Sequence, residues 1–180
     1  MHRQRVRQLI EEYATRYPSE MDTVERFRDF VNQNARCFER DCWAGHVTGS
    51  AWVVDRAGTR VLLTHHRKLD RWLQLGGHSD GDPDSFEVAR REAQEESGLR
   101  VSHVWESVFD LDVHLIPARK ADPAHHHFDL RFAFRASDGE GFKVSDESHD
   151  LAWVPIVRIR DYTDEPSMLR MAEKWLRAHA

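Results

Sequence analysis

One stretch in the middle of the chain limits the possible folds more than any other feature. The short apolar segment Trp72–Leu75 runs into Gly76-Gly77, and helical spacing begins near Asp82. The inner stripe of the expected helix holds Phe86, Ala89 and Ala93. Gly98 is a typical stop signal for a helix. A strand, a glycine turn and a helix in this order favour an α/β fold.

The start of this helix carries several capping signals. Asp82 or Asp84 suits the N-cap position, and Pro83 suits the first turn. Asp84 and Glu87 also have the spacing of a capping box. We therefore expect the helix to begin within this acidic segment.

Three glutamates, Glu92, Glu95 and Glu96, lie within one turn near the end of the same helix. Their spacing of i, i+3 and i+4 places them on one face, where like charges repel. The C-terminal end of the helix dipole disfavours them by a further ~0.3–1 kcal/mol. A divalent cation reverses both effects, and carboxylate oxygens suit Mg²⁺ or Mn²⁺. The alternative is a solvated acidic face, neutralised by Arg90, Arg91 and Arg100.

The remaining elements indicate an α/β architecture with one mixed sheet between helices. Two short helices are expected in an N-terminal extension over residues 1–40, followed by one domain over residues 41–180. Strands are expected at Val47–Asp55, Arg60–Thr64, within Val101–Leu115, at His126–Phe134 and at Leu151–Ile156. His65–Arg71 is expected to be a loop and Asp164–Ala180 a capped helix. Ser19 and Asp22 resemble a cap for the second N-terminal helix.

Composition argues against several classes of protein. The 180 residues carry a formal net charge of −5 and are 40% hydrophobic, which is typical of a soluble globular chain. This charge predicts no stable binding of nucleic acid and no attraction to an anionic membrane. The sequence has no signal-peptide pattern, and no run approaches the roughly 18 apolar residues of a membrane span.

The two cysteines, Cys37 and Cys42, form one C-x4-C pair without a second pair. A zinc site is one interpretation, but the pattern favours buried free thiols. This cysteine usage fits a reducing, cytoplasmic location.

The stretch from Gly77 to Leu99 resembles the Nudix box, G-x5-E-x7-R-E-U-x-E-E-x-G-U, where U is a bulky apolar residue. The residues in register are Gly77, Arg91, Glu92, Glu95, Glu96, Gly98 and Leu99. Pro83 replaces the first glutamate, Ala93 replaces the first U, and Leu75 stands where proline usually precedes Gly-Gly. The resemblance extends over residues 45–160. It implies a Nudix-like α/β/α sandwich with a central mixed sheet, extended by the N-terminal helices and a C-terminal helix.

The resemblance implies a hydrolase that cleaves a diphosphate bond in a nucleoside diphosphate-linked or nucleotide-like small molecule. Mg²⁺, or Mn²⁺, would be held by Glu92, Glu95 and Glu96, with the backbone carbonyl of Gly77 nearby. Arg91 would orient these carboxylates by bidentate hydrogen bonds. Glu147 is the leading candidate for a further acidic ligand or base. Asp146 and Asp150 are its alternatives.

Two other segments are candidates for binding the substrate. His125, His127, Asp129 and Arg131 share one strand face, which either binds phosphate or an extra metal ion or is the wet side of a sheet. Arg67 and its neighbours His65, His66 and Lys68 form either a phosphate-binding loop or a solvated loop. Trp72 either stacks on a base or packs in the core. The predicted substrate-binding residues are Arg67, His127 and Asp129.

Two other functions compete with hydrolysis. An isopentenyl diphosphate isomerase-like enzyme would need a cysteine and a further set of metal-binding histidines, and Cys37, Cys42 and His46 do not present that arrangement in the sequence. A non-catalytic ligand-sensing domain tends to lose box carboxylates, whereas this chain keeps three. The N-terminal helices either shape a pocket or form a homodimer interface.

Overall fold

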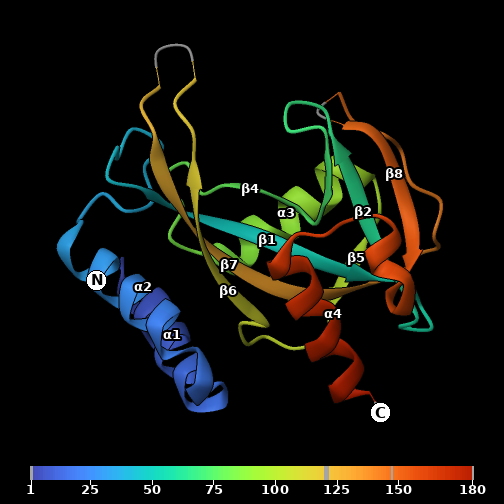
Figure 1. Ribbon diagram of the computed structural model, residues 1–180, viewed down its shortest axis with the longest axis horizontal. Coiled ribbons are helices and arrows are strands. Elements are labelled where there is room, and N and C mark those ends of the chain that lie inside the picture. Colours follow the sequence, from blue (N-terminus) through green and yellow to red (C-terminus); the bar gives the residue numbers. More distant parts are fainter. Residues whose placement is uncertain (1, 120–121, 147, 180) are drawn as a thin grey trace.

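A mixed β-sheet forms the centre of the molecule (Figure 1). The computed structural model describes residues 2–119, 122–146 and 148–179. The strands are β1 (His46–Val54), β2 (Arg60–His66), β3 (Arg71–Leu73), β4 (Leu75–His78), β5 (Val101–His103), β6 (Asp110–Ile116), β7 (His125–Ala136) and β8 (Ser148–Pro155). The helices are α1 (Gln4–Arg16), α2 (Met21–Gln33), α3 (Ser85–Ser97) and α4 (Pro166–Ala178), with 3-10 turns η1 (Pro18–Glu20) and η2 (Ile156–Asp161). The predicted α/β class is confirmed.

The sheet is organised around one parallel pair of strands. Its order is β3-β2-β1-β7-β5, while β4 pairs with β1, β6 with β7 and β8 with β2. β1 and β7 run parallel from His46↔His127 to Val54↔Arg135, and the other pairings among the described strands are antiparallel. The register of β1, β4, β6 and β7 therefore decides which polar side chains meet.

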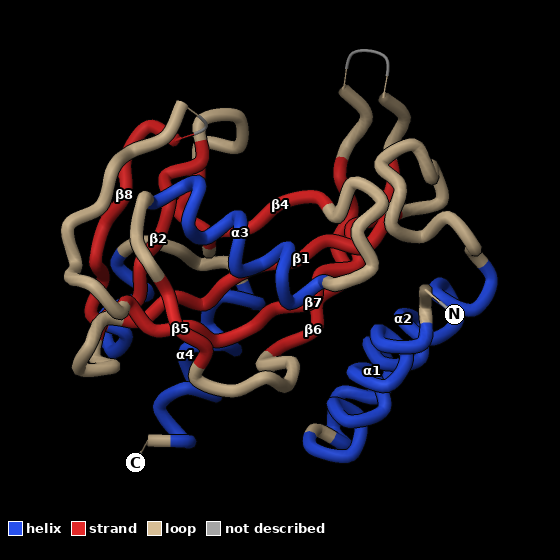
Figure 2. Tube along the Cα trace, turned by 180° about the vertical axis from the view of Figure 1, so that it is seen from behind, coloured by secondary structure: helices blue, strands red, loops and turns tan. Residues whose placement is uncertain are grey.

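Helices cover both faces of this sheet, and each face carries an apolar core that a helix shares. On one face, Leu130 and Phe132 of β7 share a core with Ala89 of α3. On the other face, Trp52 of β1 shares a core with Trp175 of α4. Figure 2 shows α3 in front of the strands and α4 behind them. The sequence prediction of a sheet between helices is thus confirmed.

The N-terminal extension packs against the sheet. α1 and α2 lie side by side (Figure 1) and bury the apolar stripe that their helical spacing predicts. The ring of Phe30 stacks on that of Phe128 in β7, with 3.8 Å between centroids. The extension therefore shares the core that α3 covers.

Some predicted boundaries are wrong. The N-caps of α2 and α4 are Glu20 and Glu165, and neither makes a side-chain capping bond. The 3-10 turn η1 leads directly into α2, so Ser19 and Asp22 do not form the expected cap. The segment predicted as a loop from His65 to Arg71 is shorter, because β2 continues to His66 and pairs with β3 through His65↔Trp72.

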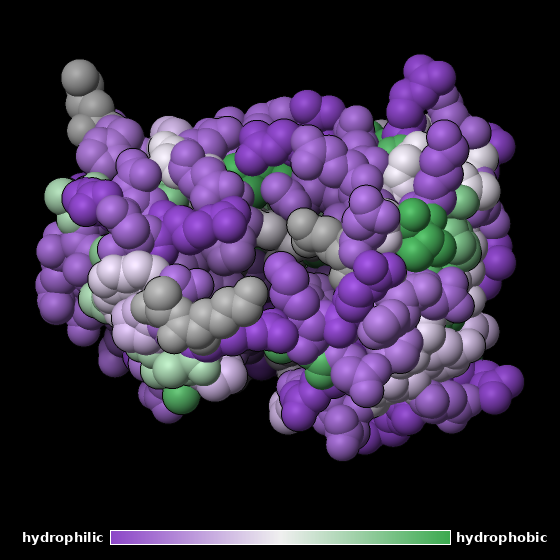
Figure 3. Space-filling model, turned by 90° about the horizontal axis from the view of Figure 1, so that it is seen from above, coloured by the Kyte–Doolittle hydropathy of each residue, from purple (hydrophilic) through white to green (hydrophobic). Residues whose placement is uncertain are grey.

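None of the helices in the described ranges is long and apolar enough to cross a membrane. Large exposed apolar side chains are scattered, such as Val157 and Leu115. The face in Figure 3 is mainly hydrophilic, with separate small apolar spots.

Candidate active site on helix α3

The sequence signals around α3 fix its two ends. Asp84 is the N-cap, and its Oδ1 accepts a hydrogen bond from the backbone N–H of Glu87 at 3.2 Å. The sequence suggested that Pro83 lies in the first turn of the helix. In the structure Pro83 precedes the N-cap, so this prediction is wrong. Gly98 ends the helix in the left-handed conformation, with φ of 70°. Asp84 and Gly98 thus set where α3 begins and where it ends.

The three glutamates of α3, which we call the box glutamates, differ in environment. Glu96 is 6% exposed, and its Oε1 accepts a hydrogen bond from the backbone N–H of Gly76 at 2.8 Å. The Glu92 carboxylate lies so close to Gly77 that a Cβ there would overlap it. Glu95 is exposed and makes no hydrogen bond or ion pair with any residue that the structure describes. Glu92 and Glu96 therefore lie against β4, and Glu95 faces solvent.

This donor set fits a hard divalent cation such as Mg²⁺. Its side-chain ligands are carboxylate oxygens, which Mg²⁺ and Mn²⁺ prefer. The Glu92 carboxylate can approach position 77 this closely only because glycine has no side chain. The sequence prediction that glycine and glutamates meet here is consistent with this packing.

The arginines near the box pair with acids outside the box glutamates. Arg90 pairs with Glu87 at 2.6 Å, Arg91 with Asp82 at 3.4 Å and Arg100 with Asp138 at 2.6 Å. Each of these arginines thus has a partner outside the box glutamates, and Glu95 pairs with none of the three. Orientation of the carboxylates by Arg91 stays a prediction.

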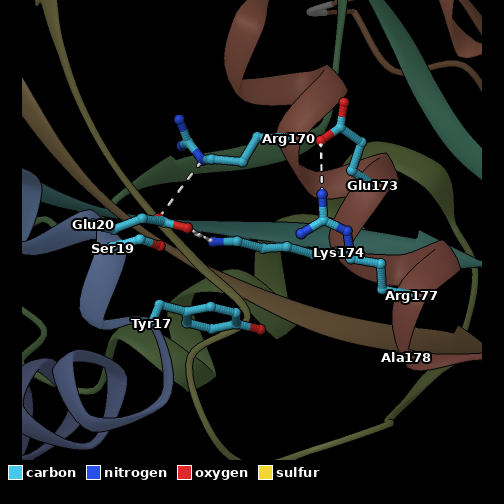
Figure 4. Close-up of a pocket in the computed structure, with 8 residues that line it drawn as sticks. All are labelled: Tyr17, Ser19, Glu20, Arg170, Glu173, Lys174, Arg177 and Ala178. Atoms are coloured by element: carbon cyan, nitrogen blue, oxygen red, sulfur yellow. Dashed lines mark hydrogen bonds and ion pairs between the residues drawn. The ribbon is translucent and has the colours of Figure 1, made fainter.

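Among the described residues, two hollows lie in different parts of the molecule. One of about 200 Å³ is lined by side chains of α3, including Arg91 and Glu95. A larger one, of about 460 Å³, lies between the η1 turn and α4, where Glu20 pairs with Lys174 (Figure 4). The larger hollow contains no residue of the box, so we place the candidate active site at the smaller one.

Asp129 and Arg131, both predicted near a substrate site, are instead part of a buried network. Asp129 is 2% exposed, and its Oδ1 accepts hydrogen bonds from the hydroxyls of Thr48 and Ser50, each at 2.8 Å. Its Oδ2 accepts one from Nε of Arg131 at 2.8 Å. Asp129 therefore ties β7 to β1, and its binding of substrate stays a prediction.

The network continues into α4, a feature that sequence reasoning missed. Asp110 is fully buried and pairs with Arg170 and Lys174, each at 2.7 Å. Burial raises the pKa of Asp112, but His114, Arg131 and Arg170 outweigh it and hold that pKa well below its usual range. The alternating acids of β6 opposite the alternating charges of β7 were the available signal.

The other predicted site residues have separate environments. Arg67 is exposed and donates a hydrogen bond to the backbone carbonyl of Ser148 at 3.0 Å. Glu147 lies outside the described residues. Its alternatives Asp146 and Asp150 are exposed. Trp72 stacks on His65 with 5.1 Å between ring centroids.

His127 lies among other histidines on the face of the sheet that carries Asp129. Burial, together with the nearby rings of His78 and His46, lowers the pKa of His127 to about 2. Its imidazole is therefore neutral at physiological pH, which argues against His127 as a cationic phosphate ligand.

Comparisons with known proteins identify the family. A family model for the NUDIX domain matches residues 45–175. A NUDIX-family hydrolase from Clostridium perfringens superimposes with a TM-score of 0.56 at 23% identity, covering 74% of this chain and 97% of that one. A C. elegans Ap4A hydrolase gives 0.56 at 18% identity, covering 73% and 98%. The E. coli dihydroneopterin triphosphate pyrophosphohydrolase gives 0.57 at 16% identity, covering 71% and 92%.

A search of curated proteins finds no match. The structural likenesses, all below 25% identity, support the fold. The family match spans most of the chain and contains the glutamate-bearing helix α3. It also contains Gly76 and Gly77, which lie within strand β4 and not in the turn that the sequence predicted. The chain belongs to the Nudix family, the family of pyrophosphohydrolases that the box residues indicated.

Proposed function

We propose that this chain is a divalent-metal-dependent hydrolase that cleaves a diphosphate bond in a nucleoside diphosphate-linked or nucleotide-like small molecule. The observation that carries the proposal is the placement of the box glutamates: two against the glycines of β4, and the third open to a hollow. Phosphoanhydride hydrolysis needs charge neutralisation and a positioned water.

Glu92, Glu95 and Glu96 are the residues that would hold Mg²⁺ or Mn²⁺, together with the carbonyl of Gly77. When bound, the ion supplies charge neutralisation to the phosphate oxygens and lowers the pKa of a coordinated water. The hydrogen bond from Gly76 restrains Glu96, so one of these carboxylates is oriented before any ligand arrives. Arg91, whose partner Asp82 lies 3.4 Å away, is the nearby cation that would orient the others.

Residues from other elements complete the proposal. Arg67 is exposed at the end of β2, where its guanidinium is free to meet a phosphate after releasing the Ser148 carbonyl. Glu147 precedes Ser148 in sequence, and we propose it as the base or further ligand, with Asp146 and Asp150 as alternatives. His127, as a neutral hydrogen-bonding group, and the buried Asp129 complete the proposed substrate contacts.

The substrate class draws on two of the structural neighbours. Their names give Ap4A and dihydroneopterin triphosphate as what they act on, and both contain consecutive phosphates. We propose the same bond type here, in a small molecule, for a protein that acts in the cytoplasm. The α1–α2 pair would either border the substrate or form a homodimer contact.

The two competing functions make different demands. An isomerase of the isopentenyl diphosphate type would need a cysteine with its histidines, and the histidine cluster found in the described part of the chain includes no cysteine. A ligand-sensing domain would bind nucleotides without turnover. Product analysis therefore separates all three functions.

The test is a panel of nucleoside diphosphate-linked compounds, dinucleoside polyphosphates and nucleoside triphosphates, each incubated with Mg²⁺ or Mn²⁺. Products are separated by chromatography for the wild type and for Glu95→Gln, Glu96→Gln and Glu173→Gln. Glu173→Gln is the control, because Glu173 is an exposed glutamate of α4, away from the candidate active site, and pairs with Arg177. We expect a cleaved phosphoanhydride, lost by at least about 100-fold in the first two variants and kept in the control. Wild-type rates in Glu95→Gln and Glu96→Gln would refute the assignment.

A further inference from the structure

Five histidines from four described strands meet on the sheet face opposite α3. They are His46 at the start of β1, His78 at the end of β4, His125 and His127 at the start of β7, and His114 of β6, whose ring lies 5.4 Å from that of His127. The register aligns His46 with His127 across the parallel pair, and Thr48 with His78 across the antiparallel pair. Because paired residues point to the same face of a sheet, these rings converge.

Ring positions confirm this convergence. The centroid of His46 lies 4.8 Å from that of His125, 4.7 Å from that of His127 and 5.1 Å from that of His78. The centroids of His78 and His127 are 5.0 Å apart. His46 is therefore at the middle of what we call the histidine cluster.

The spacing of nitrogen atoms is close to that of a metal site. One ring nitrogen from each of His46, His125 and His127 lies within 4.8 Å of the others. Three imidazoles around a tetrahedral Zn²⁺, at Zn–N distances of about 2.0–2.1 Å, have nitrogens about 3.3 Å apart. Small rotations of the rings would close this difference.

Unpartnered nitrogen atoms point to a missing ligand in the same place. His46 is 1% exposed, and neither of its ring nitrogens has a hydrogen-bond partner in the described ranges. Nε2 of His127 is also buried without a partner among the described residues. Buried polar atoms of this kind cost ~1–3 kcal/mol each when nothing satisfies them.

His125 has the hydrogen bond that is typical of a metal-bound histidine. Its Nδ1 lies 2.8 Å from the backbone carbonyl of Pro123, and because a carbonyl only accepts, Nδ1 must carry the proton. The lone pair of Nε2 is then available to a metal ion. In metal sites, a hydrogen bond from the ring nitrogen that does not bind the metal fixes the tautomer and the orientation of the histidine ring.

The histidine cluster is separate from the box glutamates. Gly77 and His78 are consecutive residues of β4, and strand alternation sends them to opposite faces. Gly77 is paired with Gly49, whose position is packed against α3, whereas His78 is paired with Thr48 on the other face. One set offers carboxylates for hard ions, and the other offers imidazoles, which suit zinc, cobalt, nickel and copper.

We propose that His46, His125 and His127, with His78 beside them, form a second metal site that binds one Zn²⁺ or a similar borderline divalent ion. The site uses neutral imidazoles on three strands. The bound ion joins β1 to β7, and also β4 where His78 takes part. This inference stands on the cluster itself and does not depend on the hydrolase proposal.

The test uses untagged, full-length protein freed of metal by a chelator. Co²⁺ is titrated while the visible absorption bands of Co²⁺ are recorded, and Zn²⁺ is then added in competition. Zn²⁺-loaded protein is also studied by X-ray absorption, in which imidazole ligands give a characteristic outer-shell signal that carboxylates lack. The variants are His125→Gln, His127→Gln, His126→Gln and Glu95→Gln.

We expect one Co²⁺ per chain, displaced by Zn²⁺, with at least three imidazoles in the X-ray absorption spectrum and a raised Tm. His125→Gln and His127→Gln should each weaken Zn²⁺ binding by at least about 100-fold, since loss of an outer hydrogen bond alone costs 10–100-fold. His126→Gln is the matched control, because its alternating position faces away from the cluster. Glu95→Gln should also bind Zn²⁺ normally, even if hydrolysis is lost.

Three results would overturn the proposal. They are no stoichiometric binding to wild-type protein, a zinc spectrum dominated by oxygen ligands, or unchanged affinity in both histidine variants. The wild-type spectrum is decisive even if a variant fails to fold. The first result would mean that the cluster holds only water.

Discussion

Two groups of acidic side chains in this fold differ in how their negative charge is balanced. The aspartates of β6 and β7 (Asp110, Asp112 and Asp129) lie inside the protein, and three cations of the chain contact them: Arg131, Arg170 and Lys174. The box glutamates lie at the edge, and one of them, Glu95, has no partner in the described part of the molecule. Charges balanced within the chain stabilise the fold, whereas an open carboxylate is available to an ion from solution.

The comparison predicts a large stability loss when the aspartate network loses its central cation. Arg131→Met removes the guanidinium that lies 2.8 Å from Asp129 and 3.4 Å from Asp110. Breaking a buried pair leaves uncompensated charge, so we expect the free energy of unfolding to fall by about 3–5 kcal/mol, measured by urea denaturation. Arg28→Met, at an exposed pair with Glu11, should change it by less than about 1 kcal/mol. Equal losses of stability in both variants would show that the buried aspartate network contributes no more than an exposed ion pair.

At the box, the comparison predicts an effect on rate instead of stability. Gly77→Ala places a methyl group where the Glu92 carboxylate lies, so the carboxylate must move. Since misplacing a catalytic group costs rate, we expect kcat with Mg²⁺ to fall about 10–100-fold, with little change in the urea midpoint. Gly141→Ala is the control, because nothing lies within 4 Å of its added Cβ. An unaltered kcat in Gly77→Ala would show that the position of the Glu92 carboxylate does not matter for the reaction.

The aspartate network also predicts a pH dependence. The pKa of Asp112 is held below its usual value in the folded state, so its contribution to stability is present above the unfolded pKa of about 3.9 and is lost as pH falls through the folded value. Asp112→Asn should therefore cost about 2 kcal/mol at pH 7. The gap from wild type should shrink below about pH 4, in urea titrations at several pH values. A constant gap would show that charge is not the reason for the loss.

Local patterns were sufficient for α3 and for the strands of the parallel pair. The side chain of Asp84 caps the start of α3, and the left-handed backbone of Gly98 ends it. Both signals depend on nearby residues only. The alternation around Phe128 and Leu130 predicted β7 because both faces of the strand follow its two-residue period. The family resemblance then indicated which glutamates of α3 are the candidate metal ligands.

The pairing of segments that are far apart in the chain could not be predicted from the sequence. Whether Asp129 faces substrate or Thr48 depends on the register between β1 and β7, which are about eighty residues apart. The same register brings His46 next to His127, so the histidine cluster could not be read from a single segment. The link between Asp110 and Lys174 likewise depends on where α4 docks.

The central claim is that the box glutamates bind a divalent ion beside a phosphate chain. Titration of metal-free protein with Mn²⁺, followed by the electron paramagnetic resonance signal of free Mn²⁺, tests this without any substrate. We predict saturable Mn²⁺ binding to wild type and Glu173→Gln, competed by Mg²⁺, and at least about tenfold weaker binding to Glu95→Gln. Equal Mn²⁺ affinity in all three proteins would contradict the account.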